Sequence, residues 1–199
     1  SEILDCYSSS NIVAYAFSGG LIGRCYDDST VVINNCYAEG SVNSTGSLAG
    51  GFIGAFIGRR ISDCYANGNV TTTNSSAGGF AGAILYPAIV EKCYSLGETT
   101  GDLYVGGFIG YLAGDYFNQS LHSSVINCYS RGNSNGNGKV GGFTGSCSYS
   151  DVSNCYSTGT AESLSDTPGG FSGYNDDGNI TNCYWDTESS GLSTSYGGT

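Results

Sequence analysis

The stretch INNCYAEGSVNSTGSLAGGFIG, residues 33–54, contains both motifs from which the rest of the chain is built. Its first part places an aliphatic residue three positions before a Cys-Tyr pair, and its last part is a Gly-Gly-apolar-x-Gly segment. The two motifs alternate along the chain with a period of about 28 residues, apart from stretches where loops are inserted. Self-similarity at a period of this length indicates a repeat architecture.

The copies agree well beyond the two motifs themselves. Six of the seven copies have Asn or Asp before the Cys, with Lys92 as the exception, and six have a small residue two positions after it, with Trp185 as the exception. An eighth pair, Cys25-Tyr26, falls outside the rhythm. The cysteines of the regular copies are Cys6, Cys36, Cys64, Cys93, Cys128, Cys155 and Cys183. The glycine motifs begin at Gly19, Gly50, Gly78, Gly106, Gly141 and Gly169.

The repeat predicts an all-β fold, a parallel β-solenoid (β-helix) of about six to seven coils of roughly 28 residues. Short apolar runs broken by Gly, Asn and Ser indicate strands and turns, and no run has the period of a helix. One repeat cannot bury its own apolar face, but stacked repeats can, at the spacing of about 4.8 Å between neighbouring strands. We expect residues 1–190 to form a single repeat domain and residues 191–199 to be an irregular Gly/Ser/Thr-rich tail.

The cysteines and tyrosines of the repeat are expected to point in opposite directions, the cysteines inward as small buried hydrophobic residues and the tyrosines outward. A corner or a bulge at the Asn/Asp position would reconcile this with an inward aliphatic residue three positions earlier. The outward tyrosines form a candidate surface-binding or stacking ladder. Its members are Tyr7, Tyr37, Tyr65, Tyr94, Tyr129, Tyr156 and Tyr184.

Two cysteines lie off the repeat ladder, and they are the better candidates for disulfide bonds. Cys25 and Cys147 each follow the last glycine of a Gly-Gly motif by two residues. The pairs Cys25–Cys36 and Cys147–Cys155 would each lie within one repeat. Stacked ladder cysteines point the same way, which suits the dihedral angle of a disulfide badly, so thiols are expected there.

Composition excludes several functions. The chain has 6 Lys+Arg against 17 Asp+Glu and a net charge of −11, which disfavours nucleic acid and anionic membrane surfaces as partners. No apolar run approaches the roughly 18–20 residues of a membrane-spanning helix, so no membrane insertion is predicted. The only histidine is His122, and no CxxC pair is present. We therefore predict no catalytic, metal-binding or cofactor-binding residues, no cofactor and no enzyme activity.

The cysteine count and the chain start favour an extracellular or cell-surface location. Nine cysteines in 199 residues are unusual for a cytosolic protein. The sequence starts at Ser1 and contains no Met, as expected of a processed secreted protein or of a fragment of a longer chain.

At this level of detail the sequence resembles a known family. The alternation of GGFxG with IxNCYSxG is similar to the GLUG-motif repeats of bacterial and archaeal secreted and surface proteins, including adhesin-like proteins. The ending from Cys183 to Gly191 also resembles the way such arrays terminate. The resemblance implies a β-solenoid at the cell surface, and it supplies no catalytic residues.

Three functions remain open. The first is a structural, non-enzymatic β-solenoid that self-assembles end to end through its terminal coils into a surface filament or forms the rod of an adhesin, because no capping helix is predicted at either end. The second is an adhesion module that binds a glycan or a surface protein through the tyrosine face or the insertion at 111–122. The third is a spacer domain of a larger secreted hydrolase.

Overall fold

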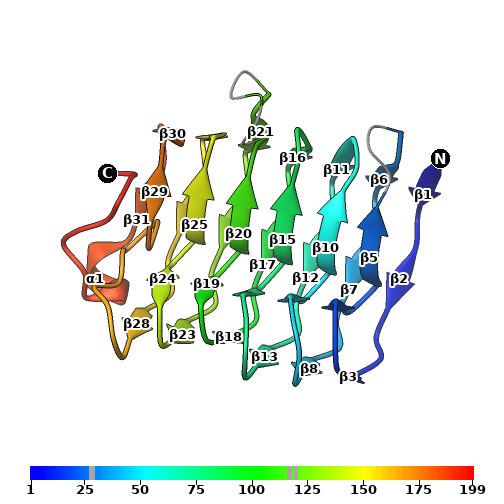
Figure 1. Ribbon diagram of the computed structural model, residues 1–199, viewed down its shortest axis with the longest axis horizontal. Coiled ribbons are helices and arrows are strands. Elements are labelled where there is room, and N and C mark those ends of the chain that lie inside the picture. The colour runs from blue at the N-terminus through cyan, green and yellow to red at the C-terminus, as the bar shows by residue number, and fades with distance from the viewer. Residues whose placement is uncertain (27–29, 116–117, 119–120) are drawn as a thin grey trace.

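The computed structural model describes residues 1–199 except 27–29, 116–117 and 119–120, and it is a parallel β-solenoid of about six turns (Figure 1). This confirms the predicted fold class. Five parallel sheets, which we name A to E in the order in which each coil visits them, run along the long axis. Part of the insertion at 111–122 lies outside the described residues.

Sheets A and B follow each other around the Cys-Tyr motif. Sheet A consists of β1 (Glu2–Leu4), β6 (Val32–Asn34), β11 (Arg60–Ser62), β16 (Ile89–Glu91), β21 (Ser123–Ile126), β26 (Ser150–Ser153) and β30 (Asn179–Thr181). Sheet B consists of β2 (Tyr7–Ser8), β7 (Tyr37–Ala38), β12 (Tyr65–Ala66), β17 (Tyr94–Ser95), β22 (Tyr129–Ser130), β27 (Tyr156–Ser157) and β31 (Tyr184–Trp185).

The other three sheets contain the segment between the motifs and the glycine motif itself. Sheet C consists of β3 (Ile12–Ala14), β8 (Val42–Ser44), β13 (Val70–Thr72), β18 (Thr99–Thr100), β23 (Ser134–Gly136) and β28 (Ala161–Ser163). Sheet D consists of β4 (Ser18–Gly19), β9 (Ala49–Gly50), β14 (Ala77–Gly78), β19 (Tyr104–Gly106) and β24 (Lys139–Gly141). Sheet E consists of β5 (Ile22–Tyr26), β10 (Ile53–Ile57), β15 (Ala81–Leu85), β20 (Ile109–Ala113), β25 (Thr144–Ser148) and β29 (Asn175–Asp176).

The Asn/Asp position forms the predicted corner between sheets A and B. Its backbone is left-handed in every copy, with φ between 51° and 55°, a conformation that Asn and Asp tolerate better than most residues. The corner changes the parity of the chain, so that both Ile33 and Cys36 are buried while Tyr37 lies outside. The register is one to one, with Ile33 opposite Ile61 and Tyr37 opposite Tyr65.

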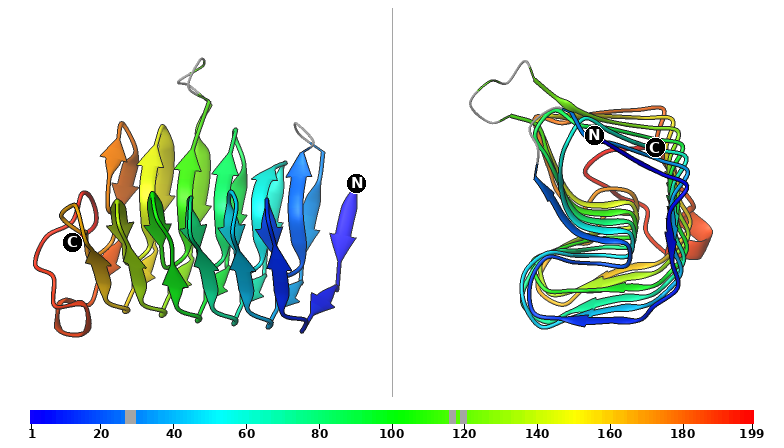
Figure 2. Two further views of the ribbon diagram at one scale, coloured as in Figure 1. Left: turned by 60° about the horizontal axis from the view of Figure 1, so that its bottom comes forward. Right: turned by 90° about the vertical axis from the view of Figure 1, so that its right-hand side faces the viewer.

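The cross-section narrows to a waist where the two motifs meet, and the waist separates two cores (Figure 2). The larger core contains the Phe, Ile and Cys columns of sheets A, B and E, and the smaller one contains the Val and Ala columns of sheets C and D. A Cβ atom on Gly51 would lie 3.0 Å from Cβ of Ala66 and 2.1 Å from the carbonyl oxygen of Gly79. At the waist Ser130 Oγ donates to the Gly142 carbonyl at 2.6 Å. Glycine and a small residue are therefore required together.

The two ends of the solenoid differ. At the C-terminal end a four-residue helix, α1 (Thr187–Ser190), and residues 191–199 turn back over the last coil, whereas no described segment packs against the outer edge of the first coil (Figure 2). Residues 191–199 contain no strand and pack against the domain, so the chain itself covers its C-terminal edge, which the sequence analysis did not foresee. No helix in the described part of the chain has the length and apolarity to cross a membrane.

Candidate functional site

The seven repeat tyrosines lie on the outer face of sheet B, where neighbouring rings stack in parallel. Ring centroids from Tyr7 to Tyr156 are 4.8–5.2 Å apart and the ring planes differ by 1–14°. Tyr184 continues the column in register with Tyr156. Because each interior ring has a neighbour on both faces, the column presents ring edges and hydroxyl groups to solvent. Tyr7 and Tyr184 lie at the two ends of the column, and 66% and 55% of these residues are exposed.

Two phenols of the tyrosine column have a raised pKa. Partial burial, followed by the nearby charge of Glu39, raises the pKa of Tyr65 above its ordinary value. Burial also raises the pKa of Tyr129, over whose ring the Arg131 guanidinium lies at 5.3 Å. The phenols of Tyr65 and Tyr129 are therefore neutral hydrogen-bonding groups at physiological pH. Stacked rings of this kind stabilise neighbouring strands.

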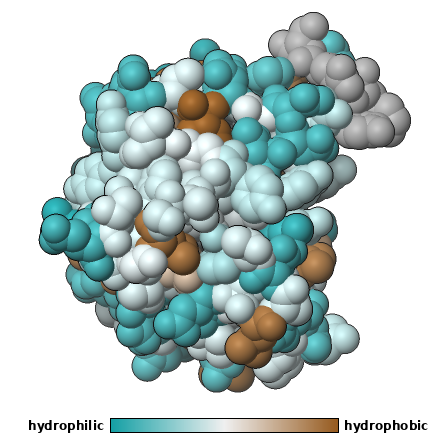
Figure 3. All heavy atoms as spheres, turned by 90° about the vertical axis from the view of Figure 1, so that its left-hand side faces the viewer, coloured by the Kyte–Doolittle hydropathy of each residue, from teal (hydrophilic) through white to brown (hydrophobic). Residues whose placement is uncertain are grey.

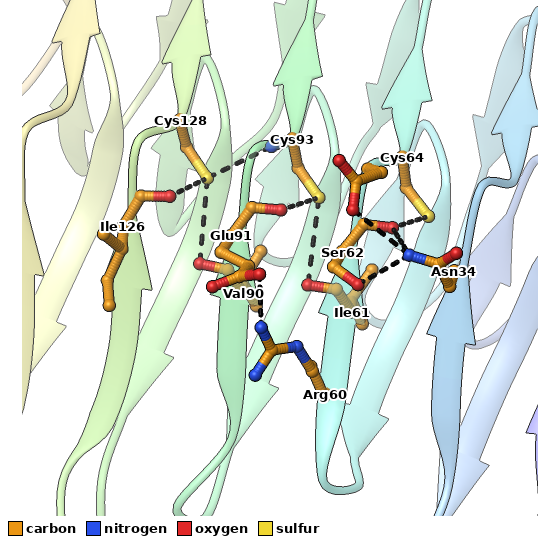
Figure 4. Close-up of polar contacts among 11 residues, drawn as sticks. Asn34, Arg60, Ile61, Ser62, Cys64, Val90, Glu91, Cys93, Ile126 and Cys128 are labelled. Atoms are coloured by element: carbon orange, nitrogen blue, oxygen red, sulfur yellow. Dashed lines mark hydrogen bonds and ion pairs between the residues drawn. The ribbon is translucent and has the colours of Figure 1, made fainter.

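The cysteine column makes hydrogen bonds that the sequence analysis missed (Figure 4). The backbone N–H of Cys93 donates to Sγ of Cys128 in the next coil at 3.4 Å, and that thiol donates to the Ile126 carbonyl at 3.3 Å. The same backbone-to-sulfur bond joins Cys6 to Cys36 at 3.3 Å. Each thiol thus caps the left-handed corner, and a purely hydrophobic residue would leave the buried N–H without an acceptor. The signal in the sequence was the Asn or Asp that precedes six of the seven repeat cysteines.

Burial keeps the Cys36 and Cys147 thiols protonated. Desolvation raises the pKa of Cys36 to about 11 and that of Cys147 to about 12, from an ordinary value of 9.0. These two thiols therefore remain neutral rather than acting as thiolate nucleophiles. In the described part of the chain no group of three or more His, Cys, Asp and Glu side chains is placed to hold a metal ion.

The structure corrects the disulfide prediction. No disulfide joins the cysteines of the described residues, so neither Cys25–Cys36 nor Cys147–Cys155 is formed. Cys25 lies opposite Phe56, and Cys147 lies opposite Leu112 in an inward column of sheet E. The two cysteines are core residues of this second column, whereas Cys36 and Cys155 point into the core from the corner between sheets A and B. The irregular spacing of Cys25 and Cys147 reflected a different column, which a search for Cys-Tyr repeats could not reveal.

The remaining surface features are less organised. A hollow of about 350 Å³ on the side of sheet C is lined mainly by Thr, Asn and Gly, with Glu162 as its only charged side chain. His122 pairs with Asp151, with 3.2 Å between Nδ1 and Oδ1. Arg60 pairs with Glu91 across neighbouring coils (Figure 4). Neither the hollow nor the ion pairs bring together a nucleophile, a base and a group that orients the base.

Comparison with known proteins identifies the repeat. Residues 101–135 match the family described as the GLUG motif, which confirms the resemblance found in the sequence. The matched segment contains strands β19, β20, β21 and β22, and with them one glycine motif and one Cys-Tyr pair. No curated protein matches the chain. The motif and the β-solenoid together fit a structural extracellular repeat domain.

Proposed function

Starting from a β-solenoid that carries the GLUG motif, we propose that the chain is a structural, non-enzymatic rod of an extracellular or cell-surface protein. The observation that carries the proposal is the continuity of the inward columns. Stacked phenylalanines run from Phe52 to Phe171 with ring centroids 4.7–4.9 Å apart, and each of these side chains is fully buried. Such a stack has the same cross-section along its length, as a spacer requires.

The tyrosine face supports this rod rather than a glycan-binding module. Protein side chains commonly hold sugar rings by stacking against an open aromatic face, but the interior tyrosines use both faces on each other. The exposed rim of hydroxyl groups offers hydrogen bonds at the spacing of the strands without a pocket. The column is therefore best interpreted as part of the inter-coil packing, in the same way as the buried phenylalanines.

The location rests on the GLUG motif and on the acidic composition, with a net charge of −11 that favours solubility. The cysteine count does not support it further, because seven of the nine cysteines are buried and none of the nine forms a disulfide. A spacer domain of a secreted hydrolase would be the same kind of rod, joined to a catalytic domain in a larger protein. The end-to-end filament is less well supported, because the C-terminal edge is covered.

Negative-stain electron microscopy of the purified chain, combined with antibody labelling of intact cells that produce the native protein, tests the proposal. We expect separate short particles at all protein concentrations and labelling of unpermeabilised cells. Labelling only after permeabilisation would contradict the surface location. A screen against glycan arrays is the companion experiment, since specific binding that Tyr94→Ala abolishes without loss of stability would favour the adhesion module instead.

A further inference from the structure

The C-terminal tail replaces a missing coil, bond for bond, over the end of the phenylalanine stack. In the interior, the amides of a core phenylalanine and of the residue after it both donate to the phenylalanine carbonyl of the next coil, as Phe108 and Ile109 do to Phe143 at 2.8 and 3.0 Å. In the last coil the amides of Phe171 and Ser172 donate instead to the hydroxyl of Ser195, at 3.2 and 2.9 Å. One side-chain oxygen thus takes the place of a backbone carbonyl.

The replacement extends to the glycine motif and to the cysteine corner. Gly170 N–H donates to the Thr194 carbonyl at 3.0 Å, where interior glycines use the next coil. At the corner each tyrosine N–H normally donates to the cysteine carbonyl of the coil before it, and at the end Thr199 N–H donates to the Cys183 carbonyl at 2.8 Å. The tail therefore satisfies three separate sites of the last coil.

Trp185 anchors this arrangement. It occupies the position that is Ala or Ser in the other copies, and its indole lies against Gly170, where a Cβ would meet the ring at 2.1 Å. Its Nε1–H donates to the Leu192 carbonyl at 2.9 Å, which holds the tail across the end. Figure 3 faces this end and shows hydrophobic side chains only as separate spots among polar ones.

The opposite end of the solenoid presents the complementary edge, which no segment among the described residues of this chain covers. Leu21 and Ile22 are only partly buried, although their counterparts Phe52 and Ile53 are inaccessible to solvent. Tyr7 and Cys6 are exposed at the start of their columns. In the interior of the solenoid the same positions pack against the preceding coil. The exposed edge of the first coil is therefore in register with the edge that the last coil would expose if its tail were removed.

From this complementarity we infer that residues 185–199 are a cap that blocks head-to-tail association, by occupying the edge on which the N-terminal coil of a second copy would dock. The inference goes beyond the proposed rod function, which does not depend on it. Docking would add β1, β2 and β5 of the second copy as parallel strands next to β30, β31 and β29. Because the contact is heterologous and does not close, unmasking the edge would produce filaments.

The test uses variants of the 199-residue chain and size-exclusion chromatography with light scattering. In Trp185→Ser/Ser195→Ala, we expect faster hydrogen exchange at the amides of Phe171 and Ser172 and at least a doubling of the weight-average mass with increasing concentration. The native chain should stay monomeric. If the double variant keeps slow exchange at these amides, a second variant with residues 192–199 replaced by Gly and Ser removes the cap contacts at constant length.

A proline at the other edge identifies the surface that associates. Ser9 occupies the position of Glu39, whose N–H donates to the Ser8 carbonyl of the preceding coil at 2.9 Å. Ser9→Pro in the uncapped variant should restore the monomer, whereas Ser9→Ala, which keeps the N–H, should not. A monomeric protein with fast-exchanging Phe171 and Ser172 amides would overturn the inference, and so would filaments of the native chain. Both results leave the rod function open.

Discussion

The backbone N–H of Cys128 donates to Sγ of Cys155, one coil further along the solenoid, at 3.4 Å. The Cys155 thiol in turn donates to the carbonyl of Ser153 in its own coil at 3.2 Å. A single side chain thus serves both the contact between coils and the corner within a coil. This double use explains a repeated cysteine where an alanine would fill the space more simply.

Replacing Cys155 by alanine, which cannot accept a hydrogen bond, should therefore destabilise the protein more than replacing it by serine, which can. Cys155→Ala leaves the buried N–H of Cys128 without a partner, and we expect a loss of about 1–3 kcal/mol in the free energy of unfolding. Cys155→Ser keeps an atom that both accepts and donates, so its loss should be smaller. Urea unfolding of the two variants checks the order, and an alanine variant as stable as the native chain would contradict the role assigned to the thiol.

Stability should fall at alkaline pH because the buried thiols resist ionisation. In the unfolded chain Cys147 loses its proton near its ordinary pKa of 9.0, but in the folded chain it keeps the proton until about 12. Between these values the folded state binds more protons, so the free energy of unfolding decreases as pH rises, by at most about 1.4 kcal/mol per pH unit for each such thiol. Cys147→Val should have a shallower dependence in urea unfolding between pH 8 and 11, and an unchanged slope would argue against this source.

The corner offers a stabilising substitution. Lys92 has φ of 52°, in the column where the other six copies have Asn or Asp. A left-handed residue costs roughly 1–2 kcal/mol, and Asn and Asp reduce that cost with local hydrogen bonds. We expect Lys92→Asn to stabilise the protein by about 0.5–1 kcal/mol, corresponding to a rise in Tm of about 1–4 °C in a scanning calorimeter. The reverse exchange, Asn127→Lys, should destabilise by a similar amount, and equal Tm values in all three proteins would refute the argument.

The waist should tolerate no additional side-chain atom. Gly51→Ala would place Cβ 2.1 Å from the carbonyl oxygen of Gly79, so the neighbouring coil has to move. Overpacking in a core typically costs 1–3 kcal/mol, and we expect at least about 3 kcal/mol here because the obstructing atom is backbone. Asn67→Ala, at an exposed position of the same coil region, is the control and should change the free energy of unfolding by less than about 0.5 kcal/mol. A mild effect of Gly51→Ala in urea unfolding would show that the coils can separate.

The fold and its columns could be predicted from the sequence because each position of a repeat has the same surroundings in every coil. Ile33 and Cys36 are three residues apart, so a straight strand would point their side chains to opposite faces. The left-handed corner at Asn35, between sheets A and B, lets both point inward, as expected. Six further copies repeat this evidence, so one local argument determined the architecture of nearly the whole chain.

The features that escaped prediction depend on contacts between different parts of one coil. Ala66 and Gly51 belong to separate motifs, and nothing in either motif indicates that they meet at a waist. Cys147 was predicted to form a disulfide because it lies off the Cys-Tyr ladder. Its column partners, Leu112 and Asn175, share no residue type with it, so the sequence did not indicate that it belongs to a column. The hydrogen bonds from the Phe171 and Ser172 amides to Ser195 belong to the last coil, so the repeat pattern could not predict them.

The direction of the strands has a mechanical consequence. The strands lie across the long axis of the solenoid (Figure 1), so the hydrogen bonds between coils point along that axis and carry tension applied to the two termini. Under such a load the coils would peel away one at a time from the N-terminal end, which lacks the contacts of the C-terminal tail. Each would release a chain of about 28 residues, or roughly 90–100 Å when extended. The rod would thus lengthen in equal steps under force, and each step would dissipate part of the applied work.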